Sequence, residues 1–312
     1  MNPAPSIVVF TTASGAGYGL LAWLGVLRPL GLLPADAGFA LLALLLAAVL
    51  ITAGLLSSLK HLGRPERAWR ALSQWRSSWL SREGVAAIAT YIPLVAMGYA
   101  LLTEAPRLAQ AAGLLAAAGA VVTIWCTGMI YGSLKTVRQW RHTAVPWGYL
   151  VFGCFCGAAI LAALAALWGE ARIPAMLAAL LGGGAIALKR AYWEAVDAPP
   201  PADAPTIESA TGLGRIGRTR PLDPPHTEQN WLLREMGFRV ARKHSAKLRR
   251  LTLAGFALAT LLALLAIPVS GSLAALLLVP AALVASAAML VERWLMFAEA
   301  THTVMLYYSG EA

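Results

Sequence analysis

The sequence predicts an all-α polytopic membrane protein, a bundle of eight transmembrane helices, and three observations lead to that fold class. Of its 312 residues, 59% are apolar and only 13% are charged, whereas soluble domains carry about 25% charged residues. Uncharged apolar stretches of about 20 residues, the length that crosses a bilayer as a helix, recur along the chain. Most Lys and Arg residues fall between these stretches. An ordinary soluble enzyme is excluded, because so few charged side chains could not cover its surface.

The uncharged stretches predict each helix in turn. Six helices are expected near residues 6–27, 37–59, 84–103, 108–134, 144–168 and 173–188. The 41 positions of residues 251–291 carry no charge and are too many for one span, so the Pro and Gly residues between 268 and 271 divide them into a helical hairpin. The eighth helix could continue to about Tyr308 and would then project beyond the bilayer. An even number of helices places both termini on one side.

These helices divide the chain into three parts. Residues 1–193 hold the first six helices, residues 194–247 form a Pro-rich and then basic amphipathic link, and residues 248–312 hold the last two helices and a tail. Residues 228–250 interleave apolar side chains with Arg and Lys. This segment is either an amphipathic helix lying on anionic membrane lipids or a docking site for a cytoplasmic subunit. Residues 1–10 lack the basic start of a secretory signal, so the first helix is expected to be retained.

The distribution of the 25 Lys and Arg residues predicts which side each connection faces. The formal net charge of +10 would suggest a nucleic-acid partner in a soluble protein, but in a membrane protein basic loops stay in the cytoplasm. The links after helices 2, 4 and 6 carry 21 of these residues, and the links after helices 1, 3, 5 and 7 carry three. We therefore expect no nucleic-acid partner, cytoplasmic N- and C-termini, and a multi-pass location in the bacterial cytoplasmic (inner) membrane.

Residues that could hold a redox metal are few. Cys126, Cys154 and Cys156 all lie in apolar stretches and are too few for a four-thiolate centre. A b-type haem needs paired histidines at bundle depth, but only His61 and His302 lie near helices, and both lie near helix ends. We expect no metal site and no haem in this chain.

The connection between the second and third helices holds the strongest candidate site. Residues 58–84 combine basic residues with three Trp side chains of the kind that anchor at membrane interfaces. Anchoring explains the Trp and Arg residues, yet it leaves His61 and Glu83 at the ends of two helices, where they could approach each other. A neutral imidazole can donate to a carbonyl oxygen, and a carboxylate can pass a proton. Such a pair suits a quinone, whose two-electron reduction takes up two protons.

Four further residues are expected around the quinone head. Trp79 and Arg82 lie just before the acidic residue, Arg64 lies in the same connection, and Tyr131 lies near the end of the fourth helix. Each has a simpler interpretation. A lone interfacial tyrosine or tryptophan is commonly an anchor, and Arg64 and Arg82 could only hold the loop.

The last helix carries a second set of polar residues. These are Glu292, Arg293, Glu299, Thr301, His302 and Thr303. Ionisable groups are costly inside a membrane, which makes them functional candidates. The set is an interhelical salt-bridge network, a helix end outside the bilayer, or part of a proton path.

Two runs in the connection after the second helix resemble a known family. Residues 61–70 (HLGRPERAWR) and residues 76–83 (RSSWLSRE) are similar to the signature of the membrane-anchor subunits of dimethyl sulfoxide reductase, the DmsC family. The resemblance implies an anchor without haem that binds a quinol or quinone and exchanges electrons with an iron-sulfur subunit, which connects to a molybdopterin catalytic subunit. It places the family's histidine on His61 and its acidic residue on Glu83, the positions tied there to quinone binding and proton exchange.

Two departures from that reductase are informative. Its catalytic subunits sit outside the cytoplasmic membrane, whereas here the corresponding loops carry nearly all the Lys and Arg, and the link after the sixth helix is longer than expected. Both features resemble the SoeC branch, the anchor of a cytoplasm-facing sulfite-oxidising molybdoenzyme. The resemblance then implies a subunit of a quinone-linked enzyme, with electrons passing from sulfite through an iron-sulfur subunit docked on the basic loops to ubiquinone or menaquinone.

The sequence leaves three other functions open. The chain could anchor a dimethyl sulfoxide reductase or another reductase that oxidises quinol. It could be a purely structural anchor without a quinone site. It could also transport protons or solutes.

Overall fold

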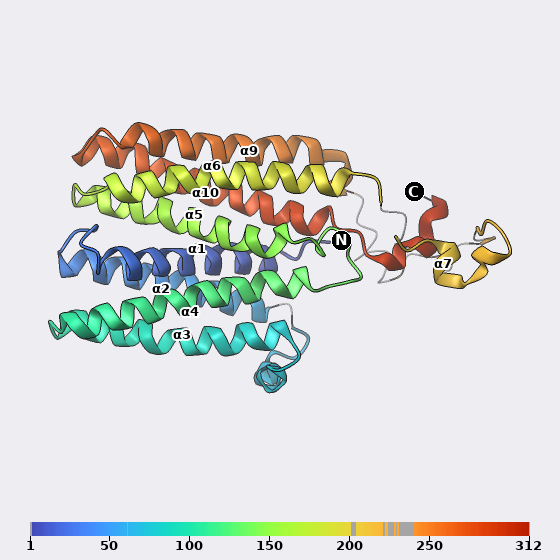
Figure 1. Ribbon diagram of the computed structural model, residues 1–312, viewed down its shortest axis with the longest axis horizontal. Coiled ribbons are helices and arrows are strands. Elements are labelled where there is room, and N and C mark those ends of the chain that lie inside the picture. The colour runs from blue at the N-terminus through green and yellow to red at the C-terminus, as the bar shows by residue number, and fades with distance from the viewer. Residues whose placement is uncertain are drawn as a thin grey trace.

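The computed structural model describes residues 2–60, 62–200, 204–220, 222–223, 228, 230 and 240–311. Within these ranges, eight helices are long and apolar enough to span a membrane. They run side by side along the long axis of the molecule (Figure 1). The predicted all-α bundle is therefore confirmed, and the chain is a multi-pass membrane protein.

The spanning helices follow the predicted order. In the described part of the chain they are α1 (Pro5–Leu27), α2 (Ala37–Leu59), α3 (Trp79–Leu102), α4 (Pro106–Gly132), α5 (Ala144–Leu167), α6 (Arg172–Asp197), α9 (Val240–Ala266) and α10 (Gly271–Ala298). Short elements lie outside them: the 3-10 helices η1 (Pro65–Gln74), η2 (Leu213–Arg215) and η3 (Thr303–Glu311), and the helix α7 (Ile207–Thr211). The turn between α9 and α10 falls where the sequence predicts the hairpin.

Three helices, α3, α6 and α9, extend past the charges that were expected to end them. α9 begins at Val240 rather than near residue 251, so it includes the basic residues between 242 and 250, most of which were assigned to the link of residues 194–247. α3 begins at Trp79 rather than near residue 84, because the Arg82 guanidinium turns back to the preceding connection and hydrogen bonds backbone carbonyl oxygens there. α6 continues to Asp197 rather than ending near residue 188. Lys189, which the charge count assigned to the following link, is buried and paired with Glu292 of α10. A charged side chain that finds a partner or a route to the interface need not end a helix.

The last helix is shorter than the longest run the sequence allowed. α10 ends at Ala298, and the chain then crosses the connection between α4 and α5. There the Thr303 amide donates to the Thr136 carbonyl at 2.9 Å, and Val137 forms an antiparallel bridge with His302. These backbone contacts hold the tail against the end of the bundle, so it does not continue as one straight helix.

α1 lies at the centre of the bundle and contacts α2, α4, α5 and α10. α3 lies at one edge against α4, whereas α6 and α9 lie together at the opposite edge (Figure 1). The residues of α1 and α5 that face each other include two pairs of glycines spaced four apart, Gly15 and Gly19 in α1, and Gly153 and Gly157 in α5. A Cβ atom on Gly157 would overlap the backbone of Gly19, so the two helices are in backbone contact.

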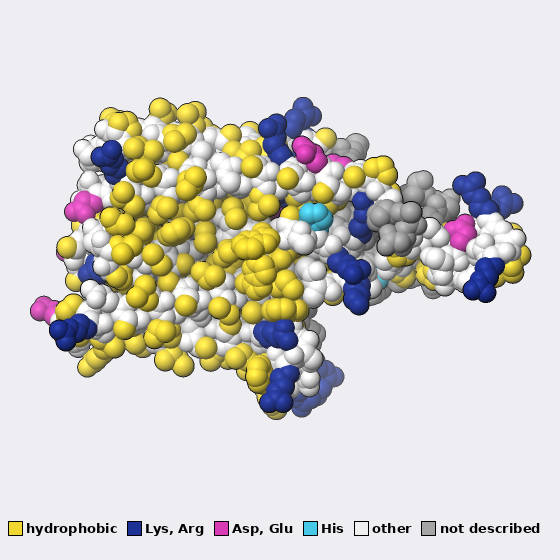
Figure 2. Space-filling model, viewed as in Figure 1, with side chains coloured by type: hydrophobic (Ala, Val, Ile, Leu, Met, Phe, Trp, Pro, Cys, Tyr) yellow, Lys and Arg dark blue, Asp and Glu magenta, His cyan; other side chains and the backbone are white. Residues whose placement is uncertain are grey.

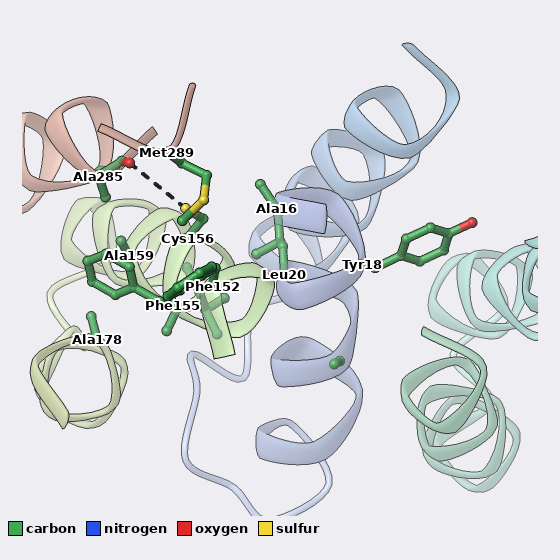
Figure 3. Packing of buried hydrophobic residues seen from close by; sticks show 14 of the residues in the cluster. Ala16, Tyr18, Leu20, Phe152, Phe155, Cys156, Ala159, Ala178, Ala285 and Met289 are labelled. Carbon is green, nitrogen blue, oxygen red and sulfur yellow. Dashed lines mark hydrogen bonds between the residues drawn. The ribbon is translucent and has the colours of Figure 1, made fainter. Parts of the chain in front are cut away.

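Apolar side chains fill the space around this crossing. Figure 3 shows Leu20 of α1 and Met289 of α10 near Cys156 of α5. Leu20 and Cys156 are almost fully buried, as is Phe155. The Cys156 sulfur lies 4.0 Å from the Ala285 carbonyl oxygen, so this thiol is part of the packed core.

Both chain termini, η1 and α7 lie at the same end of the bundle (Figure 1). Dark blue Lys and Arg side chains gather at this end in Figure 2, whereas yellow apolar side chains cover the flank of the helices. We call this end, formed by the described parts of residues 60–78, 133–143 and 198–223 and by the two termini, the basic end. An apolar flank with charge gathered at one end is the surface that a bilayer requires.

Candidate functional site

A cavity of about 570 Å³ lies at the basic end, between α1, α2, α3, α4 and η1. Much of its wall is apolar and includes Ile7, Phe10, Leu55, Leu59, Leu80 and Ile130. Its polar side chains are Ser58, Arg64, Arg67, Glu83 and Tyr131. Small-molecule sites have volumes of about 300–1,000 Å³ and combine an apolar lining with a few polar groups, so this cavity has the size and character of a ligand site.

Glu83 is the buried acid of the cavity. Because α3 begins at Trp79, Glu83 lies in the second turn of that helix, and only 5% of it is exposed. The Thr127 hydroxyl of α4 donates to its Oε1 at 2.5 Å. A carboxyl group has several acceptor positions, so this one bond leaves Glu83 able to exchange a proton with a ligand beside it.

Tyr131 reaches the cavity from α4 and belongs to a cluster of aromatic rings. Its ring stacks on Tyr149 with centroids 5.7 Å apart and planes at 13°. Trp140 and Phe297 each contact it edge-on at 5.2 Å. Tyr131 is therefore held on several sides, unlike a lone interfacial anchor. Arg64, an exposed residue next to η1, lines the same cavity.

Trp79 and Arg82 hold the connection in place. The Arg82 guanidinium lies over the Trp79 ring, 4.3 Å from its centroid. Its Nε donates to the Trp75 carbonyl at 3.0 Å and its Nη2 to the Arg76 carbonyl at 2.7 Å. The Ser81 hydroxyl also donates to a carbonyl oxygen, that of Ala71. Trp79 and Arg82 are not among the described residues that line the cavity, whereas Glu83, the next residue after Arg82, does line it.

His61 lies outside the residues that the structure describes, and so do residues 229 and 231–239 of the interleaved segment 228–250. Leu59 and Leu62 both line the cavity with Glu83. The predicted approach of His61 to Glu83 stays a prediction.

The polar residues of the last helix form two interhelical ion-pair groups. Glu292 is buried and accepts a hydrogen bond from Lys189 of α6 at 2.6 Å, and Arg293 lies 3.3 Å from its other carboxylate oxygen. Nearer the basic end, Arg249 of α9 bonds Glu299 at 2.7 Å and Asp197 at 2.5 Å. The salt-bridge interpretation therefore holds for Glu292, Arg293 and Glu299, whereas Thr301, His302 and Thr303 follow the end of α10.

Sequence reasoning missed two residues of the site. Thr127 holds the buried acid, and Tyr149 supports Tyr131. Thr127 lies four residues before Tyr131 and therefore on the same face of α4, which is a signal in the sequence. Tyr149 is on another helix, and nothing local in the sequence pairs it with Tyr131.

A family model described as the DMSO reductase anchor subunit (DmsC) matches residues 1–188 of this chain. The chain belongs to the DmsC family. Among curated proteins, a subunit of the sulfite dehydrogenase of Allochromatium vinosum is 37% identical over 189 residues. That match covers 54% of this chain and 57% of the relative, so the chain spans a little over half the length of the curated relative it matches.

The DmsC match includes every helix that lines the cavity. Residues 1–188 contain α1 to α5 and much of α6, together with η1. α9 and α10 come after the matched residues. The chain is thus a multi-pass membrane protein of an oxidoreductase anchor family. All the described residues that line the cavity lie within the residues that match the family model.

Proposed function

We propose that this DmsC-family chain is the quinone-binding membrane anchor of a three-subunit molybdopterin and iron-sulfur oxidoreductase. The cavity at the basic end carries the proposal, because its apolar wall meets the buried Glu83 and the ring-packed Tyr131. A quinone needs both kinds of surface, apolar for its ring and tail and polar for its two oxygens. The cavity volume of about 570 Å³ and its lining fit such a ligand.

Bound ubiquinone or menaquinone would supply a carrier that takes up two electrons and two protons. Glu83 exchanges protons at a ring oxygen, with Thr127 holding the carboxyl group in place. We assign His61 a hydrogen bond to a ring oxygen, on the family resemblance. Tyr131 orients the ring, and the positive charge of Arg64 stabilises negative charge that develops on it. Trp79 and Arg82 keep the connection folded over the cavity.

The proposed partner is an iron-sulfur subunit that docks on the basic end and receives electrons from a molybdopterin catalytic subunit. The exposed η1 region presents Arg70 over Trp69 at 5.6 Å and Arg76 over Trp75 at 5.4 Å. Charged and aromatic groups of this kind suit a polar protein interface. On the positive-inside rule, we propose that this end faces the cytoplasm of a bacterium.

We propose sulfite as the electron source of the complex. The supporting observations are the name of the Allochromatium relative, which belongs to a sulfite dehydrogenase, and the basic loops, which place the partners in the cytoplasm. A reductase that oxidises quinol is the second candidate, favoured by the family description. The two differ in electron direction at the same cavity.

The test is sulfite-dependent reduction of a short-chain ubiquinone by membranes that contain the full complex. Glu83→Gln and His61→Ala are each compared with Glu66→Gln, which makes the same chemical change as the first variant on an exposed side chain. We expect Glu83→Gln to reduce turnover by about a hundredfold or more, the usual contribution of an acid-base group. His61→Ala should also reduce turnover, through loss of the hydrogen bond to the ring oxygen, and Glu66→Gln should leave it unchanged.

A dye that accepts electrons directly from the iron-sulfur subunit serves as the assembly control, and its reduction should persist in all three variants. Wild-type quinone turnover in both Glu83→Gln and His61→Ala would support a purely structural anchor. Turnover with dimethyl sulfoxide and a quinol, and none with sulfite, would support the reductase.

A further inference from the structure

The ion pairs of α10 lead directly to the aromatic cluster at the cavity. Arg293 is buried, and its guanidinium carbon lies 3.8 Å from the centre of the Tyr149 ring. A guanidinium over a ring face is attracted by the negative charge density of the ring, most strongly where water is excluded. α10 therefore contacts the Tyr149 ring through the Arg293 guanidinium.

Tyr149 in turn supports a residue of the cavity wall. Its ring is stacked nearly parallel on that of Tyr131, at 13°, and Tyr131 lines the cavity. Phe297, one turn after Arg293 on α10, contacts Tyr131 directly at 5.2 Å. α10 thus reaches the cavity wall twice, through Tyr149 and through Phe297.

The position of Arg293 is itself fixed. Glu292 lies 3.3 Å from its Nη1, and Lys189 holds Glu292 from α6 at 2.6 Å. A small cavity of about 20 Å³ adjoins these three side chains. In the described part of the chain, Arg293 Nε and Glu292 Oε2 have no hydrogen-bond partner, and the adjoining space has the volume of one water molecule. Two cations, Lys189 and Arg293, thus share the single carboxylate of Glu292, and Arg293 also contacts the Tyr149 ring.

We propose that Arg293 is a positioning residue for the quinone cavity, acting through Tyr149 to hold Tyr131 in the cavity wall. The inference rests on the proposed function and deepens it, because α10 lies outside the family match and would still complete the site. Arg293 touches no quinone. It sets the angle and depth of the Tyr131 ring against which the quinone head packs.

The test uses the complete complex and measures KM and kcat for a short-chain ubiquinone, with binding of a quinone-analogue inhibitor as a second readout. Arg293→Met removes the cation but leaves Glu292 paired with Lys189. We expect KM and the inhibitor Kd to rise about tenfold with kcat little changed, the loss that a desolvated cation-ring contact implies. Arg293→Lys restores a cation and should recover most of the affinity.

Arg249→Met is the matched control. Arg249 also pairs with a carboxylate of the α10 end and also lies over a ring, that of Trp193 at 5.1 Å, but its described contacts do not include Tyr131 or Tyr149. Its KM should stay at the wild-type value. If Arg249→Met raises KM as much as Arg293→Met, the effect is general loosening of the bundle and the proposal is wrong.

Two further variants keep the proposal testable if Arg293→Met fails to assemble. Tyr149→Leu should reproduce the rise in KM. The double variant Tyr131→Leu with Arg293→Met should have the same KM and inhibitor Kd as Tyr131→Leu alone, because both changes act on the Tyr131 ring. Additive effects would overturn the proposed route. A wild-type complex that neither binds nor reduces quinone would refute the proposed function itself, whereas an unchanged KM in Arg293→Met and Tyr149→Leu would refute only this inference.

Discussion

At the residue scale, the burial of Glu83 sets the chemistry that the cavity offers. Removing a carboxylate from water costs several kcal/mol unless other groups compensate it. The Thr127 hydroxyl supplies one such hydrogen bond, and the open cavity on the other side gives room for a ligand that supplies another. This arrangement supports the proton exchange that we propose for Glu83.

Removing the Thr127 hydroxyl tests how much its hydrogen bond to Glu83 contributes to quinone turnover. We expect Thr127→Val to lower quinone turnover about tenfold, because a hydrogen bond to a charged group contributes about 1.5–3 kcal/mol. Thr123→Val, one turn earlier on α4, removes a hydroxyl that donates to the Gly119 carbonyl and leaves the donor of Glu83 intact. Steady-state assays in membranes that show equal turnover in the two variants would contradict this role.

At the element scale, the crossing of α1 and α5 places the cavity. α1 carries Ile7 and Phe10 of the cavity wall on the same helix as Gly19, which contacts α5. Small residues at a crossing let two backbones approach closely, and in a membrane this close packing is a main source of helix association. The position of α1 relative to its neighbours therefore depends on glycines two or more turns from the cavity.

A single methyl group tests this packing. Gly157→Ala would place a Cβ atom against the Gly19 backbone, and we expect it to destabilise the complex by about 1–3 kcal/mol, the usual cost of overpacking. The melting temperature of the detergent-solubilised complex should fall. Gly184→Ala, on α6 where a Cβ atom meets open space, makes the same change and should melt like the wild type. Ala favours a helix more than Gly does, so a matching loss in Gly184→Ala would mean that the loss does not come from the crossing of α1 and α5.

At the scale of the whole molecule, the basic connections and both termini lie at the same end of the bundle. The described connections after α2, α4 and α6 lie there with both termini (Figure 1), and Lys and Arg side chains gather at this end in Figure 2. The opposite end carries the connections after α1, α3 and α5, where Arg28 donates to the Pro34 carbonyl. A basic end that also holds the cavity would bring a docked electron donor near the quinone.

Reporter fusions test the orientation. A fluorescent protein that folds only in the cytoplasm should be bright when fused after residue 312 or inserted after Gly212, and an alkaline phosphatase inserted after Gly169 should be active outside. These outcomes follow because basic connections resist export. Phosphatase activity at residue 312 would reverse the orientation and place the partner subunits outside the cytoplasm.

The sequence predicted more of the fold than of the site. Uncharged stretches located all eight helices of the described chain within a few residues at most boundaries. The errors fell at the start of α3 and the end of α6, where Arg82 and Lys189 find partners in three dimensions, and at the start of α9, which includes the basic residues between 242 and 250. At the site, the sequence singled out Glu83 and Tyr131, and both line one cavity. It also grouped Trp79 and Arg82 with them, whose described contacts are to the connection.

The sequence by itself determined the membrane fold, the basic end and the acid at the start of the third helix, because hydropathy and charge are read along the chain. Only the tertiary structure decided that Thr127 meets Glu83, that Lys189 belongs to the bundle, and that α10 reaches Tyr131 through Tyr149. The physical reason is that spanning helices are apolar on the lipid face and the buried face alike. Their sequences therefore do not state which faces meet, and close packing of shape and charge between helices settles it.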